Sequence, residues 1–159
     1  MDREKIISDY LDCIIGKKVG GIGRASNMMW IWIDVEEGNP LSFDIQTDWR
    51  IINNKGKVEV GSYDIYLPNT KVKDFDTFEW DVQGQNLFDE KSQKWLKKNS
   101  EIRIKEYDVN ELGDLKLFFD NGDRLEVISN CSGESEIWRA LFKYTDREHL
   151  VFNGLGLEM

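Results

Sequence analysis

The N-terminal segment carries apolar residues at the spacing of an amphipathic helix. Asp2 is placed to cap this helix and Gly16 to end it. The apolar side chains that share one face are Ile6, Ile7, Tyr10, Leu11, Ile14 and Ile15. The pattern therefore predicts a helix over residues 3–15.

The next strong signal is an apolar run from Met28 to Ile33, after a short, glycine-interrupted strand over 17–22. The run is apolar at every position, which is typical of a strand covered on both faces and central in its sheet. In the following segment, Leu41, Phe43 and Ile45 alternate with polar residues. This alternation predicts a partner strand with one solvent-exposed face and a hairpin between the two strands.

One short sequence motif occurs twice in this chain. The segments 38–43 and 122–127 share the pattern Gly-x-x-Leu-x-apolar, and each follows an apolar run that ends in Asp. Each is also followed by Trp-Arg, at positions 49–50 and 138–139. We interpret the chain as a single domain, 1–159, with two hairpin-centred halves that form an internal pseudo-repeat, 17–60 and 101–157.

The remaining pattern supplies further strands and helices. Extended segments are predicted at 49–52, 58–60, 115–119, 125–127 and 150–152, with another strand beginning at Ile102. Residues 61–85 are mixed in character and form the expected long loop, while 86–98 and 136–143 have helical spacing. The predicted fold class is α+β: mostly antiparallel strands in two hairpin-centred halves, with an N-terminal helix and one or two further helices packed on the sheet.

The charge balance favours some partners over others. The chain carries 21 basic and 30 acidic side chains, and its net charge of −9 is spread evenly over the two halves. An acidic surface repels phosphate backbones and anionic lipids, so we expect neither nucleic acid nor a membrane as partner. A basic protein is the better candidate, and the alternative is that acidity only maintains solubility.

Compartment is predicted from the cysteines and the N-terminus. The longest apolar stretches fall far short of a membrane span, and no apolar segment follows Met-Asp-Arg-Glu-Lys at the N-terminus. Cys13 and Cys131 lie among apolar or small neighbours, so we expect both to be buried and reduced. These features predict a cytoplasmic protein.

The patterns of several catalytic and cofactor sites are missing. His149 has Asp146 and Glu148 beside it but no nucleophile motif, so we interpret it as an ordinary residue at a strand entrance. The glycines of 20–23 lack the spacing of a phosphate-binding loop. Two cysteines and one histidine far apart do not complete a zinc site, and we predict no cofactor and no metal.

The densest acidic run is interleaved with aromatic residues inside the expected loop. The candidate partner-binding residues are Asp64, Asp74, Asp76, Glu79, Trp80 and Asp81. Aromatic side chains provide a large, rigid contact area, and carboxylates around them steer a basic partner. The alternatives are a solvated acidic loop, a Ca²⁺ or Mg²⁺ site without EF-hand spacing, and a glycosidase-like carboxylate pair.

The chain resembles the immunity proteins that accompany bacterial polymorphic toxins, and small bacterial proteins of similar character. The resemblance depends on the repeated Gly-x-x-Leu-x-apolar motif, on Asp48-Trp49-Arg50-Ile51 and on the segment 149–154, His-Leu-Val-Phe-Asn-Gly. The resemblance implies a protein that occludes a toxin's active site or substrate groove and catalyses nothing. It carries over no individual functional residue.

Two other functions are compatible with the same pattern. One is a small-molecule-binding protein or hydrolase with a pocket between the two halves, using His149, Arg50 and Arg139. The other is a structural homodimer with a self-complementary face. The pattern leaves the oligomeric state open.

Overall fold

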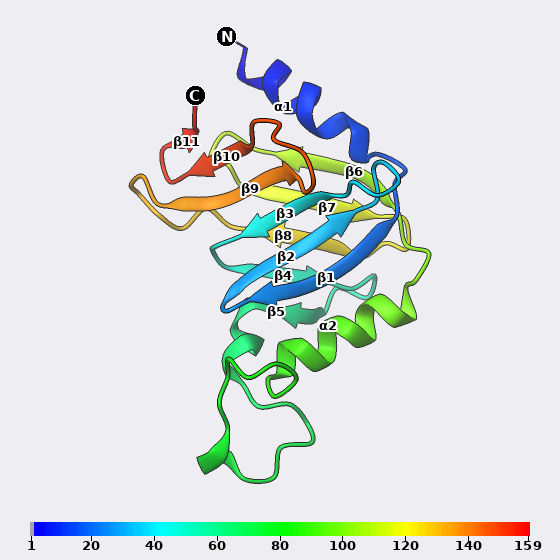
Figure 1. Ribbon diagram of the computed structural model, residues 1–159, viewed down its shortest axis with the longest axis vertical. Coiled ribbons are helices and arrows are strands. Elements are labelled where there is room, and N and C mark those ends of the chain that lie inside the picture. The colour runs from blue at the N-terminus through cyan, green and yellow to red at the C-terminus, as the bar shows by residue number, and fades with distance from the viewer. Residues whose placement is uncertain (1) are drawn as a thin grey trace.

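The computed structural model describes residues 2–159, which form two antiparallel sheets, two α-helices and three short 3₁₀ segments (Figure 1). The first half of the chain contains α1 (Arg3–Leu11), η1 (Asp12–Ile14), β1 (Val19–Ala25), β2 (Met28–Ile33), β3 (Leu41–Ile45), β4 (Trp49–Ile52), β5 (Val58–Gly61), η2 (Ser62–Tyr66) and η3 (Phe75–Thr77). The second half contains α2 (Leu87–Lys98), β6 (Ile104–Val109), β7 (Leu115–Phe119), β8 (Arg124–Val127), β9 (Glu136–Phe142), β10 (Leu150–Asn153) and β11 (Gly156–Leu157). The predicted α+β class is confirmed.

The sheets have six and five strands. The first sheet has the order β1-β2-β3-β9-β10-β11, and the second has the order β5-β4-β8-β7-β6. Both predicted hairpins are present, with Met29 opposite Ile45 and Leu117 opposite Leu125. One continuous hydrophobic core contains residues of both sheets and both helices. Each sheet is therefore built from strands of both halves of the chain.

The same order of elements occurs twice along the chain. A helix is followed by three strands in one sheet, and the chain then crosses to the other sheet for the next two strands. β1 and β6, which are counterparts in this order, carry bulges at equivalent places, between Val19 and Gly21 and between Ile104 and Glu106. Lys18 and Arg103, which precede these strands, form a bridge to each other. This topology is what a duplication would produce, and the duplication itself stays a prediction.

Each helix lies along an open side of the sandwich (Figure 1). Asp2 caps α1 by accepting from the backbone N–H of Glu4, and η1 extends the helical segment to Ile14. Tyr107 in β6 donates to Asp12 in η1 at 2.6 Å, and Arg3 in α1 donates to the carbonyl of Asn110, just after β6, at 2.6 Å. α2 packs on β1 and β5, the edge strands of the other side. The two helices thus cover edges that would otherwise expose unpaired backbone groups.

The prediction of a helix over residues 136–143 is wrong. This segment is β9, which pairs with β3 on one side and with β10 on the other. The buried residues include Ile137, Trp138, Ala140 and Phe142. Its apolar positions fit both periods over so short a segment, and pairing with strands distant in the sequence decides between them.

Three burial predictions are also wrong. The polar face of β3 is largely covered, with Ser42 2% exposed and Asp44 half-buried, because Trp32 and Trp30 of β2 stand beside them. β2 is an inner strand between β1 and β3 rather than a central one, and only Met29, Ile31 and Ile33 are fully buried. Trp30 and Trp32 lie half-buried on the outer face. On that face the two tryptophan rings stack on each other and lie against the glycines of β1, which shields part of their surface from solvent. Cys13 is exposed and Cys131 is half-buried, and both are free thiols.

Candidate functional site

The expected long loop is present and projects from the sandwich. Residues 67–85 leave the body after η2 and return at the start of α2, below the sheets in Figure 1. Two backbone hydrogen bonds close its base, from Asn69 to the Gln85 carbonyl at 2.9 Å and from Leu87 to the Leu67 carbonyl at 2.7 Å. The loop therefore has a paired stem and an exposed tip.

Aromatic side chains are exposed along the loop and beside its stem. Phe75 in η3 is 69% exposed, and Tyr63 in η2 is 71% exposed. Tyr66 packs edge-on against Trp80, with ring centroids 5.1 Å apart, and against Tyr63 at 6.0 Å. Tyr63, Tyr66 and Trp80 therefore form an aromatic cluster beside the stem, and Phe75 is a separate exposed ring near the tip.

The predicted acidic residues differ in solvent exposure and in their hydrogen bonds. Asp74, Asp76, Glu79 and Asp81 are exposed. Asp74 accepts a hydrogen bond from the backbone N–H of Asp76 at 3.0 Å, which begins η3. Asp64 lies outside the projecting loop in η2, half-buried, where it accepts from the backbone N–H of Gly61 at 2.9 Å. Asp64 and Asp74 thus each have a local structural partner, but Asp64 is half-buried whereas Asp74, Asp76, Glu79 and Asp81 are exposed.

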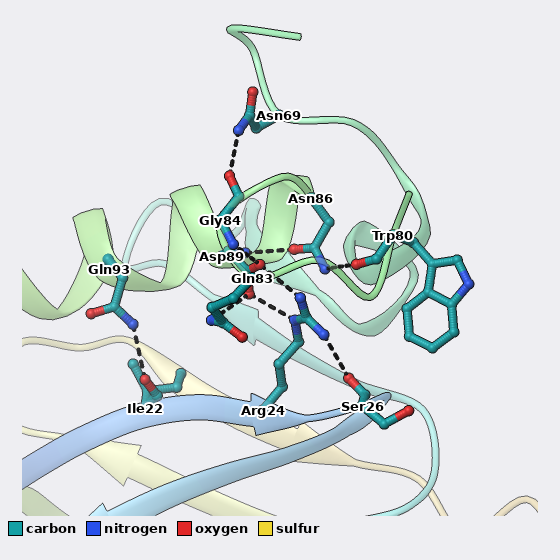
Figure 2. Close-up of polar contacts among 10 residues, drawn as sticks. All are labelled: Ile22, Arg24, Ser26, Asn69, Trp80, Gln83, Gly84, Asn86, Asp89 and Gln93. Atoms are coloured by element: carbon teal, nitrogen blue, oxygen red, sulfur yellow. Dashed lines mark hydrogen bonds and ion pairs between the residues drawn. The ribbon is translucent and has the colours of Figure 1, made fainter. Parts of the chain in front are cut away.

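A buried ion pair anchors the foot of the loop (Figure 2). Arg24 in β1 donates from Nε and Nη2 to the two carboxylate oxygens of Asp89 in α2, at 2.7 and 2.9 Å. The two side chains are 1% and 5% exposed. Asp89 also accepts from the backbone N–H of Gly84 at 2.7 Å, and Arg24 donates to the carbonyl of Ser26 at 3.0 Å. This pair ties the β1–β2 turn, the loop and α2 together.

Asn86 continues this network toward the tip. The fully buried side chain accepts from the backbone N–H of Asp89 at 2.8 Å, as the N-cap of α2, and donates to the carbonyl of Trp80 at 2.9 Å. Asn69 donates to the carbonyl of Gly84 at 2.7 Å on the opposite limb (Figure 2). Because the polar groups at the foot are satisfied, the loop is held in one arrangement relative to the sheets.

This network is only partly visible in the sequence. Arg24 stands at an otherwise inward position of β1, and Asn86 precedes an apolar and acidic helix start. The second of these is a recognisable capping signal. The pairing of Arg24 with Asp89 joins residues 65 positions apart and has no local signal.

A small polar cavity lies beside the loop's foot. It measures about 180 Å³, and its lining includes Asp48, Thr47, Tyr63, Tyr66 and Asn130. Asn130 donates to Asp48 at 3.1 Å, which connects the two chain segments that cross between the sheets. The exposed tyrosines therefore border a recess rather than a flat surface.

The alternative site that involved His149, Arg50 and Arg139 is only partly assembled. Arg139 Nη1 lies 2.9 Å from His149 Nδ1, and Arg139 also pairs with Glu136. Arg50 belongs to the second sheet, where it pairs with Glu126 at 2.9 Å. The structure brings together Arg139 and His149 and places Arg50 elsewhere.

Among residues 2–159, no group of three or more His, Cys, Asp and Glu side chains is arranged to hold a metal ion. Over the same range, no helix has the length and hydrophobicity needed to cross a bilayer. Comparison with known proteins finds no matching family model, no matching curated protein and no matching solved structure.

Proposed function

We propose that this protein is a non-enzymatic cytoplasmic module that binds a basic protein through its acidic and aromatic loop. We call the contact area the loop surface and define it by Tyr63, Tyr66, Asp74, Phe75, Asp76, Glu79, Trp80 and Asp81. The observation that carries the proposal is an exposed loop of alternating aromatic and acidic residues whose foot is held by the buried Arg24–Asp89 pair.

Each part of the loop surface has a physical role in such binding. Phe75 offers apolar area that a partner would remove from water. The four exposed carboxylates attract basic side chains over distances of about 8–10 Å and raise the rate of encounter. The anchored foot lowers the entropic cost of binding because the loop is already ordered.

The most specific form of this proposal is an immunity protein. A projecting loop can enter a concave active site, and its carboxylates can oppose the lysines and arginines that hold an anionic substrate there. The partner's activity is then blocked by occlusion, with no reaction on the binding protein. The net charge of −9 and the resemblance to immunity proteins support this form.

Site-specific photo-crosslinking tests the proposal and identifies the partner. A photoreactive phenylalanine analogue is placed at Phe75, and the protein is irradiated in cells of the organism that encodes it. Leu112, also 69% exposed but in the β6–β7 turn, is the matched control position. We expect one dominant crosslinked protein of basic isoelectric point from position 75 and none of that identity from position 112.

Equal capture from both positions, or dominant capture of acidic proteins at position 75, would contradict the loop surface as the binding site. Inhibition of the captured partner's activity by the purified protein would support the immunity form. Full activity of that partner in the complex would contradict the immunity form and leave the binding role standing.

A further inference from the structure

A cavity of about 330 Å³ lies between α1 and the C-terminal strands. These elements stand at the end of the molecule opposite the projecting loop (Figure 1). Its apolar wall is formed by Ile6, Tyr10, Leu150, Leu157 and Met159. Arg147, Glu148, His149 and Glu158 complete the lining. The volume lies within the range of small-molecule sites, which combine apolar walls with a few polar groups.

Arg147 is the distinctive polar group of this cavity. Its guanidinium lies over the rings of Tyr10 and Phe142, at 4.4 and 4.5 Å from their centroids. It forms no ion pair with any residue that the structure describes. A stacked guanidinium has a fixed plane and keeps its N–H edge available for a carboxylate.

Tyr10 contributes its ring to the cavity wall. The residue is 7% exposed, and its hydroxyl is buried with no hydrogen-bond partner among residues 2–159. Burial raises the pKa of this hydroxyl, so it is neutral and able to donate at ordinary pH. Because the hydroxyl has no accessible surface, Tyr10 presents its ring rather than its hydroxyl to a ligand in the cavity.

The other half of the molecule shows how this place can be filled. β5 is the topological counterpart of β10, and the chain after β5 continues into η2, which packs on α2 and buries Ile65. After β10 the chain turns into the short strand β11 instead, and the cavity remains between that strand and α1. The space beside α2 is therefore filled by η2, whereas the equivalent space beside α1 is left as the cavity.

We propose that this cavity binds a small amphipathic carboxylate of about ten non-hydrogen atoms. The carboxylate contacts Arg147, and the apolar part lies against Ile6, Leu150 and Leu157. Glu148 and Glu158 are exposed and do not pair with Arg147, so the stacked guanidinium is the charged group that the aromatic wall presents. This assignment is independent of the loop surface.

The test is a titration with three ligands of one chain length and different charge: octanoate, 1-octanol and octylammonium. Methyl resonances of Ile6, Leu150 and Leu157 report binding by NMR. We expect octanoate to bind with a Kd on the order of 0.1 mM and to shift these methyl signals. Octanol and octylammonium should bind at least about tenfold more weakly, because neither pairs with a guanidinium.

Two variants test whether Arg147 is the positive charge that binds the carboxylate. Arg147→Gln should weaken octanoate binding by about tenfold or more and leave octanol binding within about twofold. Lys143→Gln removes a charge from the same connection outside the cavity lining and should leave both affinities unchanged. The wild-type comparison of the three ligands stands even if Arg147→Gln does not fold.

Three results would overturn the proposal. These are octylammonium binding as tightly as octanoate, octanoate causing no shift of the three methyl groups, and an equal effect of the Arg147 and Lys143 substitutions on octanoate binding.

Discussion

Gly23 shows how a single residue can be required by its neighbour rather than by the backbone. A Cβ at Gly23 would overlap the ring of Trp30, with two ring atoms at 2.9 Å. Trp30 stacks on Trp32 with centroids 4.5 Å apart. In the counterpart strand pair of the second sheet, Asp108 stands opposite Lys116, where Gly23 stands opposite Trp30. The fold accepts a side chain at this place, and the tryptophan excludes it.

Gly23→Ala is therefore expected to lower the free energy of unfolding by about 1–3 kcal/mol through overpacking. The same substitution in a Trp30→Ala background should cost less than about 0.5 kcal/mol, which a double-mutant cycle by urea unfolding measures. Gly133→Ala is the control, because no atom lies within 4 Å of its Cβ position. Equal costs of Gly23→Ala in both backgrounds would show that Trp30 is not the cause.

The carboxyl group of Glu126 makes the free energy of unfolding depend on pH. Burial raises the pKa of this carboxyl, but hydrogen bonds from Arg124 and Arg50 outweigh burial and lower the pKa below its ordinary value. The pKa is thus lower in the folded state than in the unfolded state. The resulting stabilisation is present above the unfolded pKa and is lost as the pH falls through the folded one.

Glu126→Gln should consequently flatten the pH profile of unfolding below about pH 5. We expect wild type to lose more stability than the variant between about pH 5 and pH 3, as measured by urea unfolding at a series of pH values. Glu111→Gln, an exposed change in the β6–β7 turn, is the control. A variant profile as steep as that of wild type would exclude Glu126 as a contributor.

Among the structural elements, the Arg24–Asp89 pair fixes the position of the loop relative to β1 and α2. Asp89 belongs to the first turn of α2, and Gly84 in the loop donates to the same carboxylate. Loss of the carboxylate leaves the guanidinium of Arg24 buried without its partner. One side chain therefore contributes to both the fold and the order of the candidate site.

Asp89→Ala is expected to lower the free energy of unfolding by about 3–5 kcal/mol. Hydrogen exchange should also show faster exchange at the amide of Gly84, which loses its acceptor. Asp81→Ala removes an exposed carboxylate of the same loop and should change stability by less than about 0.5 kcal/mol. Similar values for the two substitutions would contradict the anchoring role of the ion pair.

The sequence was sufficient for those elements whose signals are local. The capped N-terminal helix, both hairpins and the long loop depend on caps, turns and alternation within a few residues of one another. β9 was misread because Trp138 and Leu141 fit a helix as well as a strand, and only the flanking strands β3 and β10 decide. Local pattern was informative where local interactions determine the structure.

The candidate site was predictable to the same extent. The exposure of Phe75 and of the four exposed loop carboxylates follows from their place in a polar, glycine-containing loop. The capping role of Asp64 and the Arg24–Asp89 anchor arise from geometry that a pattern of residues does not contain. The charge of the surface was therefore predictable, and its anchoring was not.

At the scale of the whole molecule, the halves are interlocked. β3 of the first half pairs with β9 of the second, and β4 of the first pairs with β8 of the second. The first half supplies only β4 and β5 to the second sheet, and an isolated two-stranded sheet is marginal in water. Folding of one half therefore requires the other.

A chain cut between Asp76 and Thr77, in the exposed tip of the loop, tests this interdependence. Each fragment alone should lack the near-ultraviolet circular dichroism of packed tryptophans. The mixed fragments should recover that signal and elute together at the size of the intact protein. Native-like spectra from either fragment alone would contradict the interlocked arrangement.

The central claim is that the loop surface binds a basic partner, and the most direct test is the affinity of the partner that crosslinks to position 75. A charge-neutral loop is made with Asp74→Asn, Asp76→Asn, Glu79→Gln and Asp81→Asn, which keep side-chain size. The control neutralises four exposed carboxylates elsewhere, with Glu106→Gln, Asp108→Asn, Glu111→Gln and Glu134→Gln. We expect the loop variant to raise Kd at least about tenfold at low salt and the control to change it less than about twofold. Equal Kd values for the two variants would contradict it.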